Sequence, residues 1–235
     1  MKKITVLLLL LFAIHTARAQ EKNLPLDSTY FLLGTLKDYM GRSKSKTDNE
    51  NLDRYSKHEK DLVFTLFSMF NASYPDLRIS SSKDSLNFNL YSKVLTKEMD
   101  EFYEYTPTSR CNQQRDTIYM GMLRKEMFQT DLQRLSFIAG VYARFCVAND
   151  SAYCIKLFNS MSKAKVCEEI LTDLKCSGVK YHTNKGYIPK SHFIYFTPNA
   201  EVMRYLEAYM PLRNKIEAGY QMLIKEVLPR SSSSQ

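Results

Sequence analysis

The stretch that decides the fold is KCSGVKYHTNKGYIPKSHFIYFTPNA, residues 175–200. Two runs within it, residues 179–183 and 192–197, contain many β-branched and aromatic residues and are separated by the turn-forming residues 184–186, NKG. Such runs on both sides of a turn predict a β-hairpin. Residues 193–196, FIYF, are apolar at odd and even positions alike, so we expect the second strand to be covered on both faces.

Helical patterns lie on both sides of this hairpin. Ser162 precedes a helix that ends before Gly178, and a second helix follows the hairpin from Pro198–Asn199 onward. Upstream, Tyr153, Ile155 and Leu157 alternate with polar residues, as in a strand. A helix over residues 152–161 stays open as an alternative, because its apolar residues also recur at helical spacing.

The first half of the chain has the apolar spacing of helices. One stripe follows the cap signal Asp27–Ser28, a longer one spans residues 52–70, and another spans residues 132–146. The pattern of residues 116–128 predicts a further helix. Residues 86–90 alternate like a short strand, and whether they form one stays open.

We therefore predict a helix-rich α+β fold. A helical half, residues 27–149, precedes a small β-α-β-β-α unit with a three-stranded sheet, residues 150–228; an all-α fold is the alternative. The length fits one globular domain, residues 20–228, between a signal peptide, residues 1–19, and a disordered tail, residues 229–235.

The N-terminus has the three parts of a bacterial export signal. Lys2 and Lys3 precede an apolar run over residues 4–14, and Ala17–Arg18–Ala19 offers small residues at a cleavage site. That run is much shorter than the roughly 20 residues that span a bilayer. We predict cleavage after Ala19, a periplasmic or secreted chain and no transmembrane segment. Cleavage removes three positive charges and lowers the formal net charge from +8 to +5.

The cysteines predict no catalytic or metal site. Cys146 and Cys154 lie on either side of the turn signal Asn149–Asp150 and could form a disulfide in an oxidising compartment; buried free thiols are the alternative. A zinc site needs ligand pairs two to five residues apart. The available series is wider, so we predict no metal and no cofactor: Cys167, Cys176, His182 and His192.

The predicted hairpin is the best candidate for a binding surface. The chain has no acidic residue between Asp173 and Glu201. Lysines alternate there with planar rings, a combination that binds anions. Lysines on hairpin edges also prevent aggregation, which is the purely structural explanation. The candidate binding residues are Lys180, His182, Lys185, Tyr187 and Lys190.

These observations predict an exported binding protein with an anionic partner in the envelope or outside the cell. A glycan, a lipid headgroup or an acidic protein segment would fit, whereas export and the moderate charge argue against nucleic acid. The alternatives are an exported hydrolase that uses His182 or His192 with a cysteine or serine, and a structural envelope protein. No catalytic motif occurs, so the sequence favours a protein that is not an enzyme. Oligomeric state is not indicated.

Overall fold

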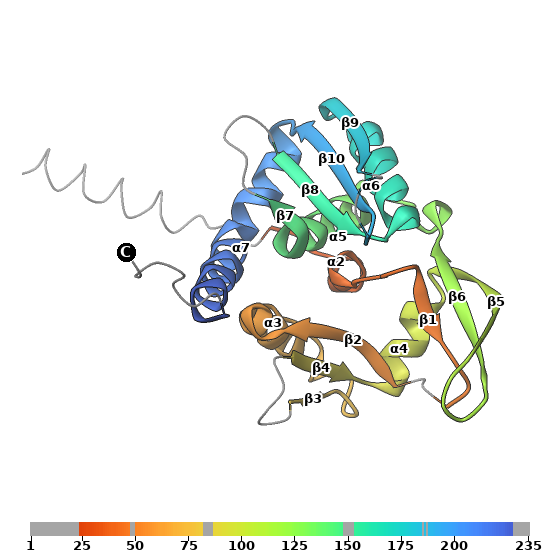
Figure 1. The fold of residues 1–235 in the computed structure, drawn as a ribbon. Helices are drawn as coiled ribbons and strands as arrows, with labels where there is room; N and C mark the ends of the chain where they lie inside the picture. The colour runs from red at the N-terminus through yellow and green to blue at the C-terminus, as the bar shows by residue number, and fades with distance from the viewer. Residues whose placement is uncertain are drawn as a thin grey trace, which may run out of the picture.

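The computed structural model describes residues 24–47, 50–81, 87–147, 153–184, 186 and 188–227. Helices and strands alternate along this whole length (Figure 1). The first part contains α2 (Ser28–Thr35), β1 (Arg42–Lys44), β2 (Asn51–Ser56), the 3-10 helix η1 (Lys57–Glu59), α3 (Lys60–Phe70), β3 (Arg78–Ser80), β4 (Asn87–Tyr91), α4 (Lys93–Asp100), β5 (Tyr103–Cys111), β6 (Thr117–Leu123) and the 3-10 helix η2 (Lys125–Met127). The second part contains α5 (Asp131–Phe145), β7 (Cys146–Val147), β8 (Tyr153–Phe158), α6 (Met161–Asp173), β9 (Ser177–Asn184), β10 (Ser191–Thr197) and α7 (Ala200–Val227).

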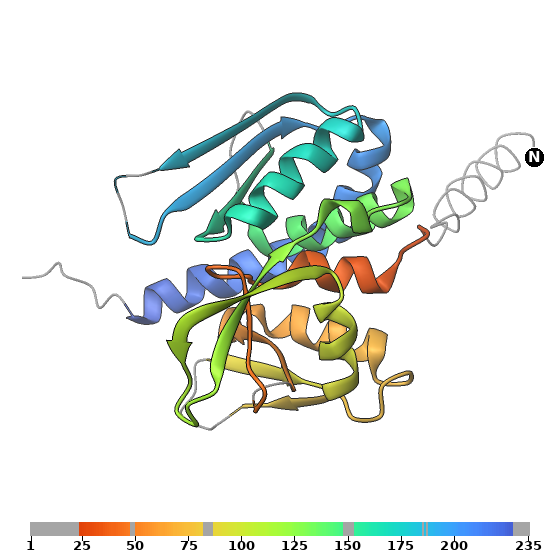
Figure 2. The same cartoon turned by 90° about the vertical axis from the view of Figure 1, so that its right-hand side faces the viewer.

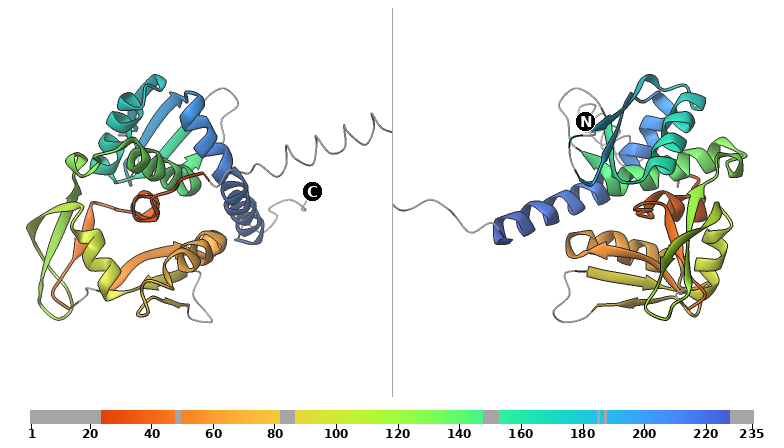
Figure 3. Two further views of the ribbon diagram at one scale, coloured as in Figure 1. Left: turned by 180° about the vertical axis from the view of Figure 1, so that it is seen from behind. Right: turned by 45° about the vertical axis from the view of Figure 1, so that its right-hand side comes forward.

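The strands form three sheets in which every pair is antiparallel. We call them sheet A, with strand order β1-β6-β5, sheet B, with order β2-β4-β3, and sheet C, with order β7-β8-β10-β9. Figure 1 shows sheet C in the upper half of the molecule and sheets A and B in the lower half, with α2 and α5 between them. The view from behind in Figure 3 shows the same division.

The predicted helical half is wrong, because residues 27–149 contribute two of the three sheets. The clearest error is in residues 52–70, where Leu52 and Tyr55 lie on β2 and only residues 60–70 form an α-helix. The pairing of β2 with β4 shifts register between Asn51 and Asp53. An extra residue at this irregularity puts two buried side chains three positions apart, which is also helical spacing.

The second half follows the sequence pattern more closely. Strands β9 and β10 form the hairpin, and residues 153–158 are a strand rather than a helix. Sheet C has four strands instead of three, because the short β7 pairs with β8. The all-α alternative is therefore wrong. The domain limits stay a prediction, and residues 1–19 and 229–235 lie outside the described residues.

Helices α2 and α5 pack closely because each has a glycine at the contact. A Cβ atom added to Gly34 would clash with the carbonyl oxygen of Phe137, and one added to Gly140 would clash with that of Phe31. Only glycine, whose side chain is a single hydrogen atom, allows two helix backbones to come this close. The contact joins the first and second parts of the chain into one hydrophobic core.

Sheet C packs on two helices. Helices α5 and α6 both contact its strands, and Figure 2 shows the long β9–β10 hairpin beside α6. Within the described residues, no helix combines the length and the apolar character that crossing a membrane requires.

Candidate functional site

The two faces of sheet C differ in burial and in chemistry. Successive side chains of a strand point to opposite faces, so the residues of β8 and β10 divide into two sets. Ile155, Leu157, Ile194 and Phe196 are at most 1% exposed and form the covered face. The register of β8, β10 and β9 places the other set side by side on what we call the outer face: Lys156, Phe158, Lys180, His182, Phe193 and Tyr195, together with the buried Cys154 and Ser191.

Aromatic rings form the middle of the outer face. The rings of Phe193 and Tyr195 are nearly parallel, with an interplanar angle of 11° and centroids 6.3 Å apart. The His182 ring lies 6.4 Å from Phe193, because the two residues are directly opposite each other in β9 and β10. Phe158 is 42% exposed, which is unusual for so large an apolar side chain.

Two lysines lie among these rings. The Lys156 Nζ atom is 4.9 Å from the ring centroid of Phe158 and 5.4 Å from that of Phe193. Lys180 is exposed and lies opposite Tyr195. Neither lysine forms an ion pair with any residue that the structure describes, in contrast to Lys44, Lys125 and Lys163. The strands of sheet C contain no acidic residue. The outer face therefore combines ring surface with positive charge.

The structure brings together only part of the predicted binding site. Lys180 and His182 lie on the outer face as exposed residues. Lys190 is exposed just before β10, where its backbone N–H donates to the Asn159 side chain at 3.1 Å. Lys185 and Tyr187 lie outside the described residues, so their part in a site stays a prediction.

Lys156, Phe158, Phe193 and Tyr195 were not predicted as site residues. The FIYF run suggested a strand covered on both faces, but Phe193 and Tyr195 remain partly exposed. Phe193 and Tyr195 alternate with Ile194 and Phe196, which are buried. Alternate residues of a strand point to opposite faces, so this alternation could have identified them if only one face of the strand had been expected to be covered.

His192 belongs to the covered face rather than to the candidate site. It is 1% exposed, and its Nδ1 atom is hydrogen-bonded to the Tyr181 hydroxyl at 2.6 Å. Burial, with a contribution from nearby Lys190, lowers the pKa of His192, so the ring is neutral near pH 7. Cys154 lies opposite Tyr195 on the other face of the sheet, so no Cys154–His192 pair forms.

The structure records the five cysteines as free thiols. Cys146 is opposite Ile155 and Cys154 is opposite Val147, so their side chains leave the sheet on different faces. This geometry does not favour the predicted disulfide. Cys167 is fully buried, and burial raises its pKa to about 12, which keeps it in the thiol form.

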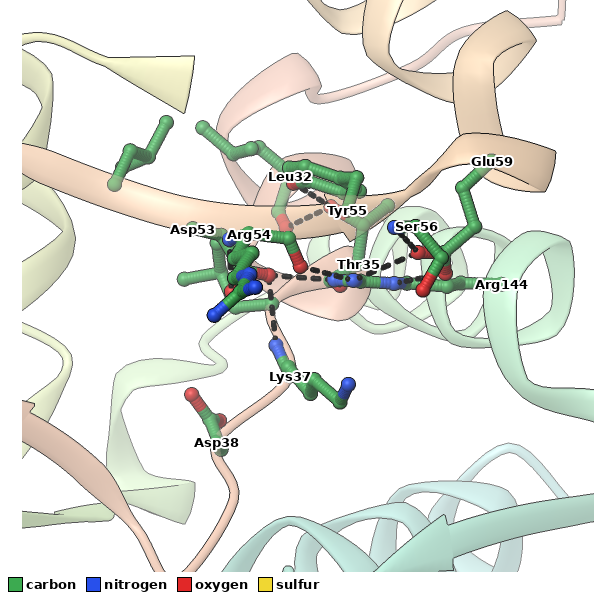
Figure 4. A network of polar contacts seen from close by, with 12 residues as sticks. Leu32, Thr35, Lys37, Asp38, Asp53, Arg54, Tyr55, Ser56, Glu59 and Arg144 are labelled. Atoms are coloured by element: carbon green, nitrogen blue, oxygen red, sulfur yellow. Dashed lines mark hydrogen bonds and ion pairs between the residues drawn. The ribbon is translucent and has the colours of Figure 1, made fainter. Parts of the chain in front are cut away.

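A second cluster of charged residues lies inside the molecule, where α5 meets α2 and β2 (Figure 4). The Arg144 guanidinium donates to Asp53 at 2.5 Å and to Glu59 at 2.7 Å. It also donates to the backbone carbonyls of Thr35 at 2.5 Å and Arg54 at 2.8 Å. Burial alone would lower the pKa of Arg144, but the two carboxylates outweigh burial and raise it. We call this group the Arg144 cluster.

Lys163, on α6, also binds the C-terminal end of α2. Its ammonium donates to the carbonyls of Leu33 at 3.0 Å, Gly34 at 3.3 Å and Leu36, and lies 3.3 Å from the Asp38 carboxylate. The last carbonyls of a helix have no partner within the helix and carry partial negative charge. Lys163 and Arg144 therefore complete the C-terminal end of α2, and the carboxylates around them are already neutralised.

Within the described residues, no three His, Cys, Asp or Glu side chains are grouped so that they could hold a metal ion. Asp38, Asp53 and Glu59 are the carboxylates near the end of α2, and each has a cation as its partner. The outer face of sheet C is thus a part of the described chain where several charged and aromatic side chains remain available to a ligand.

Comparisons with known proteins give likenesses in structure alone. No family model matches the chain, and no curated protein matches its sequence. The chain is similar to mesophilic variants of the homing endonuclease I-DmoI, with a TM-score of 0.45 and 14% identity over 81% of this chain and 95% of that one. A complex of I-DmoI with DNA and calcium has a TM-score of 0.46 and 13% identity, over 83% of this chain and 97% of that one. Full-length DUF199/WhiA from Thermatoga maritima has a TM-score of 0.40 and 10% identity, over 88% of this chain and 64% of that one.

These findings correct the predicted partner and function. The exclusion of nucleic acid is not retained; among the similar structures is a complex of I-DmoI with DNA. The glycan, lipid headgroup or acidic protein segment is not retained, and neither are the His-based hydrolase and the structural envelope protein. The comparisons add no evidence of a secreted protein. Export stays a prediction that depends on residues 1–19, outside the described residues.

Proposed function

We propose that the protein binds nucleic acid through the outer face of sheet C. The observation that carries this proposal is the arrangement, on three adjacent strands without an acidic residue, of partly exposed rings and of lysines that form no ion pair with a described residue. Lysines bind the phosphate backbone, and aromatic rings stack on bases. Both kinds of group are within reach of one ligand here, because Lys156 lies directly beside the rings of Phe158 and Phe193.

The charge of the whole chain favours an anionic partner, a class that includes nucleic acid. The formal net charge is +8, and it stays positive, at +5, without the predicted signal peptide. A positive protein attracts a polyanion over distances of about the Debye length, about 8 Å at physiological salt. The interior carboxylates are ion-paired with Arg144 and Lys163, so we propose binding rather than hydrolysis.

The test is a titration of fluorescein-labelled oligonucleotides of about 16 nucleotides, followed by fluorescence anisotropy. The double variant Lys156→Gln, Lys180→Gln should bind about tenfold more weakly at low salt, and its affinity should depend less on salt between about 50 and 200 mM. The matched control is Lys93→Gln, Lys97→Gln, which removes two exposed lysines from α4 and should bind like the natural chain.

Equal losses in the two double variants would show that binding follows net charge and not the outer face. No binding by the natural chain at about 50 mM salt, where electrostatic contacts are strongest, would contradict the proposed function itself.

Export through a cleaved signal peptide is a separate proposal. It is supported by Lys2, Lys3, the apolar run over residues 4–14 and the small residues at 17 and 19. N-terminal sequencing of the protein from its native cells should begin at Gln20. A sequence that begins at Met1 would contradict export and would place the proposed ligand inside the cell.

A further inference from the structure

We infer that the outer face of sheet C takes a single strand whose bases stack on Phe193 and Tyr195, and that it does not take a duplex in the same way. This inference rests on the proposed function and names the class of ligand. The bases of a duplex are covered on both faces by their neighbours, so their flat surfaces cannot reach a protein ring unless they are unstacked. A single strand offers those surfaces freely.

The spacing of the rings supports a strand with separated bases. The centroids of Phe193 and Tyr195 are 6.3 Å apart, and their planes differ by 11°. Successive bases in one strand of a duplex are only about 3.4 Å apart. Bases at duplex spacing therefore do not match the two rings, whereas an extended single strand can place separated bases against them.

The rings are also held in place before a ligand arrives. Phe193 and Tyr195 are partly buried on β10, which is hydrogen-bonded on both sides, to β8 and to β9. Ring positions fixed by a sheet lose little conformational freedom on binding. The side chains of the face come from three paired strands, β8, β10 and β9.

The two lysines are placed for the backbone of a stacked strand. Lys156 lies on one side of the Phe193 ring, 5.4 Å from its centroid, and His182 lies on the other side, on β9. Lys180 lies opposite Tyr195 in the same way. A base on either ring would have a lysine beside it for its phosphate. Two lysine–phosphate contacts predict a salt slope of about −1.4 for a single strand, from a slope of about −0.7 per contact.

The experiment compares a single strand and a duplex of the same length with Phe193→Leu, Tyr195→Leu. Loss of both stacking rings should weaken single-strand binding at least tenfold. Duplex binding, which uses the lysines only, should change little. The control Phe64→Leu, Tyr220→Leu removes two exposed rings from α3 and α7 and should leave both affinities unchanged. Thermal unfolding followed by circular dichroism checks that each variant folds.

A second measurement does not depend on loss of function. The chain contains no tryptophan, so Phe193→Trp introduces a single indole into the outer face. Its fluorescence should be quenched by an oligothymidine strand, because a stacked base contacts the indole, and should change little with a duplex.

The outcomes separate the inference from the proposed function. Tighter binding to duplex, with no effect of the ring variant and no quenching, would overturn the single-strand inference and leave nucleic-acid binding in place. Absence of binding to either form at low salt would overturn both. Weakened single-strand binding in the ring variant alone, together with quenching, would support both.

Discussion

The Arg144 cluster and the outer face of sheet C use charged and aromatic side chains in opposite ways. In the Arg144 cluster, a buried guanidinium lies against the Tyr55 ring, 4.1 Å from its centroid, and two carboxylates and two carbonyls satisfy it. On the outer face, Lys156 also lies beside rings, but it has no carboxylate partner among the described residues. The chemistry of the two regions is similar, and their accessibility differs.

This difference shows which region can bind a ligand. A buried charge must be paired, since an unpaired one costs several kcal/mol. The Arg144 cluster meets that requirement entirely within the chain, so nothing in it is left for a partner. The outer face has cations that water now solvates and that a phosphate can contact. We therefore expect changes in the first region to alter folding and changes in the second to alter binding.

The largest effect should come from Arg144→Met. Loss of the guanidinium leaves Asp53 and Glu59 as partly buried carboxylates without their cation and removes a donor to the Thr35 carbonyl. Breaking a buried ion pair typically lowers the free energy of unfolding by about 3–5 kcal/mol. Urea unfolding measures the change, with the exposed Arg54→Met as control. A loss below about 1 kcal/mol would mean that the cluster behaves like a surface ion pair.

The next largest effect should come from Gly140→Ala. The added methyl group would collide with the carbonyl oxygen of Phe31, so α2 and α5 would have to separate. Overpacking of this kind typically costs about 1–3 kcal/mol of unfolding free energy. Gly186→Ala is the control, because a Cβ there meets only the Asn184 side chain at 3.6 Å. An unchanged midpoint of thermal unfolding for Gly140→Ala would show that the two helices do not pack so closely in solution.

Acid should reduce the difference between the natural chain and Arg144→Met. Burial would raise the pKa of Glu59, but Arg144 outweighs burial and holds that pKa below its ordinary value of 4.5. A carboxylate with a depressed pKa stabilises the fold above its unfolded pKa and loses that contribution as pH falls through the folded pKa. Without Arg144, burial raises the pKa of Glu59, and protonation of this side chain at acid pH should remove the cost of a buried unpaired charge. Urea unfolding at about pH 7 and about pH 4 should therefore show a smaller gap at acid pH. An equal gap at both would exclude a role for Glu59.

The sequence predicts the parts of the fold that local patterns determine. The hairpin β9–β10, helix α6 and the Asp27 cap of α2 all lie where periodicity and turn residues place them. The alternation left open at residues 86–90 corresponds to β4 (Asn87–Tyr91), but the other strands of sheets A and B were missed for a physical reason. Their edges are short or irregular, and pairing rather than pattern makes them strands; β1, for example, has three residues and pairs with the distant β6.

The candidate site could be predicted only in part. Lys180 and His182 stand out because the segment around them has no acidic residue. Lys156 joins them through the pairing of β8 with β10, which no local signal specifies. The Arg144 cluster was not predicted at all, because its partners Glu59 and Thr35 are 85 and 109 residues away in sequence. Contacts of this range depend on how the helices and sheets pack together.

The smallest effect on folding should come from Lys156→Gln, Lys180→Gln. This variant directly tests the difference between the Arg144 cluster and the outer face of sheet C. Both lysines lack an ion-pair partner among the described residues, and substitutions away from buried networks usually change stability by less than about 0.5 kcal/mol. Of the two substitutions, Lys156→Gln should cost more stability. The contacts of Lys156 with Phe158 and Phe193 contribute about 0.5–1 kcal/mol to the free energy of unfolding at an exposed site. Removing the charge also relieves repulsion in a strand region that contains only positive charge. We expect these two terms to nearly cancel, so the urea midpoint should stay the same while nucleic-acid binding falls. A loss of stability comparable to that of Arg144→Met would mean that the outer face is a structural cluster like the interior one, and that its lysines are not available to a ligand.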